Sequence, residues 1–227
     1  MSSSLGETII KRLSDVYRID KDEFAPLNFK DPFLILISII LSQNTTDRNA
    51  LKAMKNLVAN GLTSSQDYVK AGADKIKPLI KVAGLYEQKA KTIISLASWS
   101  LEKYGGDLTK LKQEEPEKVY EELTEIKGIG PKTADVFLIF YLNARTFPID
   151  THIKRVVKRI GIAEGSYDVM RKKLLQVFPD PIKAHILLIK HGRTTCTARK
   201  PKCNQCVIND ICKYYASLNL SKRIDEG

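Results

Sequence analysis

The chain has 227 residues, 43% of them hydrophobic and 28% charged, a composition typical of a globular protein with one core or two modest lobes. Its longest apolar run, near residues 33–41, is too short to span a bilayer, so we expect no membrane contact. The first residues lack the basic and apolar regions of a secretion signal. These features predict a cytoplasmic protein.

Positive charge gathers in the second half of the chain. Between residues 144 and 213 there are 15 Lys/Arg and 5 Asp/Glu, so this stretch carries +10 of the total net charge of +11. A basic half beside a nearly neutral half indicates a face that binds a polyanion such as nucleic acid, which favours a nucleoid-associated location. A solvated basic surface without a partner, or lysines that serve thermal stability, would give the same composition.

Apolar residues recur at steps of three and four along most of the chain, which predicts an all-α fold. Alternating runs rich in β-branched residues are scarce. In chain order, the expected helices cover Ile9–Val16, Phe33–Leu41, Ala50–Val58, Ile93–Leu101, Val136–Leu142, Ile153–Ile160 and Met170–Phe178.

Proline and glycine mark the boundaries of these elements. Asp31-Pro32 predicts the start of one helix, Gly84 the end of another, and Pro179-Asp180-Pro181 a break between two more. The charge shift near Ala144 is the candidate domain boundary. Because chain termini often lie close together, we expect the N-terminal helix to pack with the C-terminal lobe.

A glycine turn lies between two helical patterns at Gly128-Ile129-Gly130. Either glycine can adopt a positive φ, while Ile126 and Ile129 anchor the turn and the glycine amides point outward as a nest for phosphate, often with a bound cation. An ordinary helix–helix turn would explain the two glycines alone. The following Pro131-Lys132-Thr133-Ala134 favours a helix-hairpin-helix, a grip on the DNA backbone that does not depend on sequence.

Lys132 and Asp150 form a candidate catalytic pair. Asp150 precedes a helical stretch, so the simpler interpretation is an N-cap. The alternative is that this carboxylate faces Lys132. It would then accept the proton of the ammonium group and stabilise positive charge on a sugar, although it would oppose the lowered pKa that a lysine nucleophile needs.

All four cysteines fall within one short segment, at Cys196, Cys203, Cys206 and Cys212. In a reducing compartment this C-x6-C-x2-C-x5-C spacing indicates a metal site rather than disulfides, and spacing alone does not separate zinc from an iron–sulfur cluster. Three cations lie between the first two cysteines and suit phosphate contact: Arg199, Lys200 and Lys202. A purely structural staple is the alternative.

The motifs together resemble the endonuclease III family of helix-hairpin-helix DNA glycosylases with AP lyase activity. The similar segments are 32–47, 84–90, 128–134, 148–156 and 191–212, and the resemblance covers most of the chain. It implies two helical lobes: a six-helix barrel-like domain at 24–143, with the hairpin at about 118–142, and an iron–sulfur domain formed by 1–23 and 144–227. The four cysteines in loop 196–212 would bind a [4Fe–4S] cluster.

The resemblance also implies an activity. Kinked duplex DNA with damaged bases or abasic sites would bind to a monomer, in a cleft between the lobes, with the damaged nucleotide flipped out. Lys132 would attack the sugar C1′, release an oxidised pyrimidine and cut 3′ to the site by β-elimination, with Asp150 assisting. A monovalent cation would occupy the hairpin when DNA is bound. The expected DNA contacts are Gln43, Asn44, Gly128, Gly130, Thr133, His152, Arg155, Arg193, Arg199, Lys200 and Lys202.

Two positions depart from the family pattern. Asn44 stands where the family usually has the glutamine that fills the gap left by the flipped base, with Gln43 just before it, and Asp135 stands where an asparagine is expected. A mismatch glycosylase acting on T·G or uracil, from the same superfamily, is the alternative activity. A non-catalytic DNA-binding protein on the same scaffold is another alternative. The presence of both Lys132 and Asp150 argues against it, because binding to the DNA backbone requires neither residue.

Overall fold

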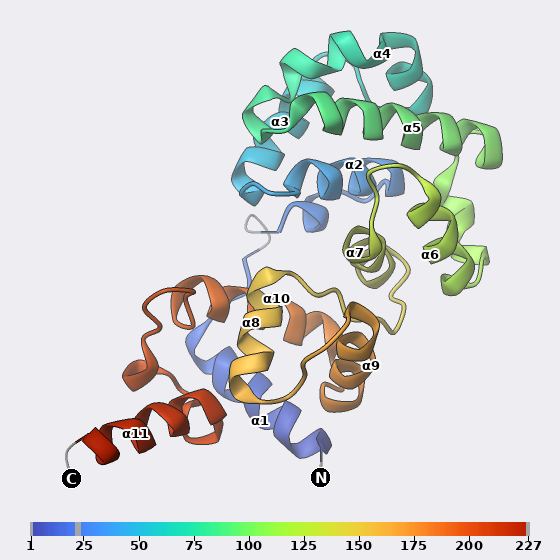
Figure 1. Cartoon of the computed structure of the whole chain (residues 1–227). Coiled ribbons are helices and arrows are strands. Elements are labelled where there is room, and N and C mark those ends of the chain that lie inside the picture. The colour runs from blue at the N-terminus through green and yellow to red at the C-terminus, as the bar shows by residue number, and fades with distance from the viewer. Residues whose placement is uncertain (1, 21–23, 226–227) are drawn as a thin grey trace. The chain divides into compact units, whose positions relative to one another are not determined.

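A computed structural model describes residues 2–20 and 24–225, and this part of the chain is helical without strands, which confirms the all-α prediction (Figure 1). No helix in these ranges is long and apolar enough to span a membrane. The α-helices are α1 (Ser2–Val16), α2 (Pro32–Ser42), α3 (Asp47–Ala59), α4 (Ser65–Leu79), α5 (Tyr86–Tyr104), α6 (Pro116–Glu125), α7 (Pro131–Tyr141), α8 (Thr151–Ile160), α9 (Tyr167–Val177), α10 (Pro181–Thr194) and α11 (Lys213–Asp225). Short 3₁₀ helices are η2 (Ala25–Asn28), η3 (Lys81–Ala83), η4 (Leu108–Gln113), η5 (Cys203–Gln205) and η6 (Asn209–Ile211).

The seven expected helices correspond to α1, α2, α3, α5, α7, α8 and α9. Periodicity did not reveal α4, whose helical dihedrals break at Gly72 (φ 70°, ψ 167°) and which contains Pro78 near its end. It also gave no range for α6, α10 or α11, although the expected hairpin at 118–142 and the break at Pro179-Asp180-Pro181 implied helices at α6 and α10. The buried run Ala184–Ile189 of α10 is apolar almost throughout and therefore lacks a polar face.

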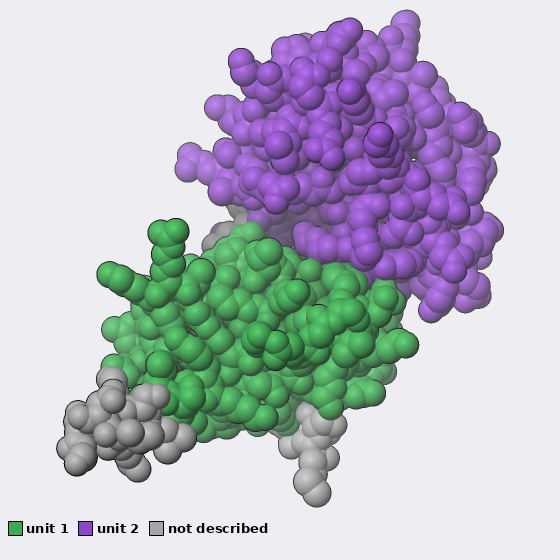
Figure 2. Space-filling view, viewed as in Figure 1, with its two compact units in different colours: residues 1–19, 145–227 green, residues 20–144 purple. Residues whose placement is uncertain are grey.

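The contacts divide the chain into two compact units, residues 1–19 with 145–227 and residues 20–144, coloured green and purple in Figure 2. The sequence predicted functional domains with boundaries near residues 24 and 143, and these domain boundaries stay a prediction. The core of unit 20–144 is built around α2, which contacts α3, α5 and α7. Asp31 caps α2 by accepting a hydrogen bond from the Leu34 amide at 3.0 Å, and Pro32 occupies its first position.

In the other unit, α1 contacts α9 and α10, so the N-terminal helix packs with the C-terminal segments as predicted. Glycine permits two close approaches here. A Cβ atom on Gly6 would lie 1.9 Å from the carbonyl oxygen of Val177, and one on Gly192 would lie 2.8 Å from Cβ of His152. The second contact brings α10 against the start of α8, the helix that Asp150 caps.

Lys89 is a buried cation in the core of unit 20–144. Its residue is only 2% exposed, and Nζ donates hydrogen bonds to the carbonyl oxygens of Leu41 and Ala83, each at 2.8 Å. Burial lowers the pKa of this amine from its usual 10.5 to about 8. The two carbonyl partners do not compensate fully for the removal of the charge from water.

This burial predicts a stability that depends on pH. Below pH 8 the amine is protonated in both states and the cost of burial is fully present. Between about pH 8 and 10.5 the unfolded chain keeps a proton that the folded protein has released, so stability rises with pH. From pH 7 to pH 10 we expect the wild type to gain about 2 kcal/mol in free energy of unfolding relative to Lys89→Met.

Chemical unfolding of both proteins at the two pH values measures this gain. The comparison between the wild type and Lys91→Met provides the control, because Lys91 is exposed two residues further along α5. A difference in free energy of unfolding between the wild type and Lys89→Met that stays constant across this pH range would contradict the prediction.

Candidate functional site

The hairpin between α6 and α7 has the geometry expected for the glycine turn. Ile126 and Ile129 are buried and anchor it. Gly128 has the positive φ, 98°, whereas Gly130 has φ −101° and caps α7. A Cβ on Gly128 would lie 2.0 Å from Oγ1 of Thr92 on α5, so both the dihedral and the packing require glycine.

The outer side of this turn presents unused amides. Among the described residues, neither Gly128 nor Gly130 donates its amide in a backbone hydrogen bond of the turn. Gly128 is exposed and Gly130 partly exposed, directly before the N-terminus of α7. Amides and a helix dipole that face the solvent together can hold a phosphate group.

Lys132 lies in the first turn of α7, directly beyond these amides, and is partly exposed. Thr133 and Asp135 on the same helix are buried, with residue exposures of 4% and 0%. The Thr133 hydroxyl accepts a hydrogen bond from Nε2 of Gln43 at 3.0 Å. The Thr133 side chain therefore makes its contact within the unit, so a contact between Thr133 and DNA would have to come from its backbone.

The loop after α2 shows how Gln43 and Asn44 differ. Gln43 ends α2, and its Nε2 also donates to the carbonyl oxygen of Gly128 at 3.2 Å. Asn44 is exposed in a left-handed conformation with φ 54°. Gln43 is thus joined to the hairpin, and Asn44 is the residue of the pair that projects into solvent.

Asp150 caps α8 in the other unit. Its Oδ1 accepts a hydrogen bond from the Ile153 amide at 2.7 Å, and the residue is half-buried. The N-cap interpretation of Asp150 is therefore correct. A carboxylate has two oxygen atoms that can accept hydrogen bonds, so the second oxygen of Asp150 can accept a proton or stabilise a positive charge while the first caps the helix.

Two arginines on α8 hold the segment that carries the cysteines. Arg155 donates to the carbonyl oxygens of Cys196 (3.1 Å) and Gly192 (2.8 Å), and its Nη2 lies 3.2 Å from Nδ1 of His152. Arg159 donates to the carbonyl oxygens of Thr197 (2.7 Å) and Ala198 (3.0 Å). The DNA contact expected of Arg155 stays a prediction. Its guanidinium group already donates to the carbonyl oxygens of Cys196 and Gly192.

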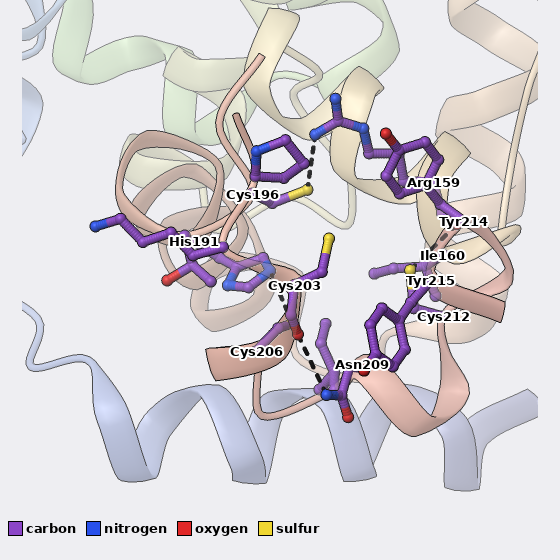
Figure 3. A pocket seen from close by; sticks show the side chains of 14 residues that line it. Arg159, Ile160, His191, Cys196, Cys203, Cys206, Asn209, Cys212, Tyr214 and Tyr215 are labelled. Carbon is purple, nitrogen blue, oxygen red and sulfur yellow. Dashed lines mark hydrogen bonds between the residues drawn. The ribbon is translucent and has the colours of Figure 1, made fainter. Parts of the chain in front are cut away.

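The four cysteines line one pocket (Figure 3). Its other walls include Arg159, His191, Ile208, Tyr214 and Tyr215. The space among these side chains amounts to about 350 Å³, part of it open to solvent. One short loop and the ends of α8 and α10 therefore bring together all the thiols of the chain.

Two of the thiols in this pocket, Cys203 and Cys206, resist ionisation. Burial raises the pKa of Cys206 to about 11, and burial together with the neighbouring Cys196 and Cys212 raises the pKa of Cys203. Nη1 of Arg159 lies 3.3 Å from Sγ of Cys196 and stabilises negative charge there. A metal centre must displace these protons, because thiolates are the binding form.

His191 contacts a second cysteine from the opposite wall. It is 2% exposed, and burial lowers its pKa to about 4, so the ring is neutral near pH 7. Nε2 lies 3.7 Å from Sγ of Cys206, and Nδ1 lies 3.1 Å from the hydroxyl of Tyr17. A ring whose Nδ1 accepts from Tyr17 has Nε2–H available for the thiolate.

The donor set fits an iron–sulfur cluster. Four thiolates around one zinc ion lie only about 3.8 Å apart, given Zn–S bonds near 2.3 Å. Within residues 2–20 and 24–225, no three His, Cys, Asp or Glu side chains converge closely enough to hold a single ion. A [4Fe–4S] cluster takes one thiolate on each of its four irons, and four cysteines lining one pocket supply that donor set.

The remaining basic residues of the loop face the solvent. Arg199, Lys200 and Lys202 are exposed, as is Arg193 near the end of α10. The backbone between them is fixed, because the Lys202 amide donates to the Thr195 carbonyl at 2.9 Å and the Thr197 hydroxyl donates to the Lys200 carbonyl at 2.8 Å. Arg199, Lys200 and Lys202 are available to phosphate groups.

Sequence reasoning missed the roles of Arg159 and His191, although both line the cysteine pocket. One signal was present: Arg155 and Arg159 are four residues apart and therefore share a face of α8. The segment containing His191 was noted without a role for its ring.

Comparisons with known proteins agree over nearly the whole chain. Residues 37–180 match the profile described as HhH-GPD superfamily base excision DNA repair protein, and residues 196–212 match the iron–sulfur binding domain of endonuclease III. Endonuclease III of Sulfolobus acidocaldarius is 38% identical over 220 residues, covering 93% of this chain and 96% of that protein. Endonuclease III of Escherichia coli K12 is 35% identical over 216 residues, covering 92% and 98%.

Solved structures show the same fold. A trapped endonuclease III–DNA covalent intermediate, the estranged-adenine complex, matches with a TM-score of 0.76 and 26% identity over 94% of this chain and 95% of that chain. A thermostable thymine-DNA glycosylase matches with a TM-score of 0.72 and 22% identity over 95% and 97%, which shows a shared fold alone.

The cysteine pocket predicts the metal content of the protein. The purified wild type is expected to be yellow-brown, with about four iron atoms per chain. Cys206→Ser should lose the colour and most of the iron, because Cys206 is one of only four thiolate donors. Iron assay and visible absorption measure both quantities. Gln205→Ser, an exposed neighbour, is the control, and a zinc-loaded colourless wild type would refute the cluster.

Proposed function

Since the chain belongs to the HhH-GPD superfamily of base excision DNA repair proteins, we propose that it is a bifunctional DNA glycosylase and AP lyase for oxidised pyrimidines. Its substrate is duplex DNA that contains damaged bases or abasic sites. The observation that carries the proposal is the position of Lys132, a partly exposed primary amine at the second residue of α7, directly after the amides of Gly128 and Gly130. A grip on a phosphate there places the amine beside the sugar–phosphate backbone.

In the proposed reaction, neutral Lys132 attacks C1′ of the damaged nucleotide. The C1′–base bond breaks, and the base leaves with the electron pair and takes up a proton. Loss of the amine proton and opening of the sugar give an imine between Nζ and C1′. Removal of a C2′ proton then breaks the C3′–O bond by β-elimination, which cuts the strand 3′ to the site, and water releases the lysine.

Asp150 is proposed as the assisting carboxylate. It accepts the proton that the ammonium of Lys132 must lose and offsets the positive charge that develops on the sugar. Its N-cap bond to Ile153 fixes the orientation of the carboxylate, so that its second oxygen is held for this work. Lys132 belongs to unit 20–144 and Asp150 to the other unit.

Cys196, Cys203, Cys206 and Cys212 would hold the [4Fe–4S] cluster, which supplies a rigid support for the basic loop rather than electrons for the reaction. Proton transfer and bond cleavage at C1′ and C3′ need no redox partner. Arg199, Lys200 and Lys202, displayed by the loop, are proposed to contact phosphates. The further contacts expected at His152, Arg155 and Arg193 stay predictions.

A nucleoid-associated monomer with a monovalent cation at the DNA-bound hairpin completes the proposal. The mismatch alternative, T·G or uracil, is not favoured, because the endonuclease III relatives cover nearly the whole chain at 35–38% identity, and the thymine-DNA glycosylase match indicates the fold alone. A non-catalytic DNA-binding protein is disfavoured by the family and by the retention of Lys132 and Asp150.

Borohydride trapping tests the lysine. With a duplex containing an abasic site, the wild type should form a covalent adduct after reduction, and Lys132→Ala should form none above background. DNA affinity of the variant should stay within about threefold, because the glycine amides rather than the amine hold the phosphate. Lys118→Ala on α6, an exposed lysine, is the control. Trapping that persists without Lys132 would remove the assignment.

Salt dependence tests the basic loop. Neutralising Arg199, Lys200 or Lys202 with alanine should reduce the slope of log affinity against log salt by about 0.9 or less for each phosphate that the protein no longer neutralises. The effect should be equal on damaged and undamaged duplexes, since phosphates carry no sequence information. Lys172→Ala on α9 provides an exposed lysine for comparison. Slopes identical to the wild type would show that the loop does not contact DNA.

A further inference from the structure

Among the described residues of unit 20–144, Asn44, Leu85 and Asn143 are exposed non-glycine residues with a positive φ, and the first two lie at loop tips that follow segments bonded to one buried lysine. Asn44, after α2, has φ 54°, and Leu85, before α5, has φ 48°. Leucine rarely adopts this left-handed region, and the Leu85 side chain is nevertheless 54% exposed rather than packed. A strained conformation at an exposed position persists only where the surrounding structure determines it.

One buried side chain is hydrogen-bonded to the segments that precede both tips. The ammonium group of Lys89 donates to the carbonyl oxygen of Leu41, three residues before Asn44, and to that of Ala83, two residues before Leu85. Both distances are 2.8 Å. The same charged group therefore fixes the last turn of α2 and the end of η3, which are far apart in sequence.

Gln43, directly before Asn44, gives this loop a second attachment. Gln43 donates from Nε2 to the Gly128 carbonyl at 3.2 Å and to Thr133 Oγ1 at 3.0 Å. Asn44 is thus preceded by residues tied to Lys89 and to the hairpin that carries Lys132. The tips and the hairpin form one connected hydrogen-bonded frame within the unit.

Burying the amine at this position is unfavourable for stability. A methionine would fill the same volume without removing a charge from water, and both hydrogen-bond partners of the Lys89 ammonium are neutral carbonyls. Only a side chain with several donors can join two carbonyls of separate segments. The chemistry therefore indicates that Lys89 is retained for position rather than for stability.

We propose that Lys89 is a positioning residue, which holds the Asn44 and Leu85 tips at a fixed separation so that they distinguish damaged from intact duplex. The inference rests on the proposed glycosylase function. Tips that are already fixed can contact a duplex whose damaged nucleotide has left the base stack without a further loss of conformational entropy. Mobile tips would have to be ordered on binding, which lowers the affinity for such a duplex. Contact with undamaged DNA depends on the phosphate grip and does not require the tips.

The test compares Lys89→Met with Lys91→Met, which removes an exposed lysine from the same helix. Affinity is measured for an undamaged duplex and for one with a tetrahydrofuran abasic analogue. We expect Lys89→Met to lower the ratio of the two affinities by about tenfold, the loss for one hydrogen bond to a charged group, and Lys91→Met to leave it unchanged. An unchanged ratio in folded, iron-loaded Lys89→Met overturns the proposal.

Two further measurements separate positioning from general damage. Hydrogen exchange at residues 42–46 and 84–85 should accelerate together in Lys89→Met and stay unchanged in Lys91→Met; unaltered exchange in both segments counts against the proposal. In an Asn44→Ala background, Lys89→Met should cost less discrimination than in the wild type, because the two act through one loop. Full additivity would show that Lys89 acts elsewhere.

Borohydride trapping shows whether a negative result contradicts the role of Lys89 or the proposed glycosylase function. Lys89→Met should still be trapped at saturating enzyme, since Lys132 is present. A wild type that is never trapped refutes the glycosylase proposal, whereas normal trapping with an unchanged affinity ratio refutes only the role of Lys89. If Lys89→Met does not fold, Lys89→Gln, which keeps N–H donors without charge, is measured in its place, with a partial loss expected and no loss contradicting the proposal.

Discussion

The contact between Gly128 and Thr92 is the constraint on which the candidate active site depends. Because the turn presses its backbone against α5, with room for no side chain, the hairpin cannot shift without opening the core of its unit. The buried Ile126 and Ile129 hold it from the inside. The outward amides and Lys132 consequently have a fixed relation to the core, which is what a reaction at a single carbon atom requires.

Much of the catalytic side was readable from the sequence, because its signals are local. The G-x-G turn, the helix start at Pro131 and the place of Lys132 in the first helical turn all depend on residues within a few positions of one another. The four cysteines were readable for the same reason. The N-cap role of Asp150 followed from the helix after it, and the structure bears it out.

What the sequence could not provide depends on contacts between distant segments. Nothing local shows that Gln43 reaches the hairpin rather than the solvent, or that Thr133 turns inward to meet it. The break at Pro179-Asp180-Pro181 implied a helix at α10, but periodicity did not show it, because a helix buried on nearly all sides has no polar face to set a period. Lys89 has the same difficulty: a lysine in a helical pattern is expected at the surface, and only the carbonyls of Leu41 and Ala83 explain its burial.

These contacts show that part of the positive charge of the chain stabilises loops rather than binding a polyanion. Arg155 and Arg159 lie in the stretch whose charge predicted a face for a polyanion, yet both are engaged with loop carbonyls, Arg159 also facing the ring of Tyr214 at 4.8 Å. Lys89 does the same in the other unit. In each case a cation on a helix fixes the backbone of a functional loop, since an ammonium or guanidinium can hold several carbonyls that no neighbouring strand or helix satisfies. Positive charge therefore has two uses in this chain. Exposed side chains such as Arg199 and Lys200 are available to phosphate, while the enclosed ones keep the loops that present them in place.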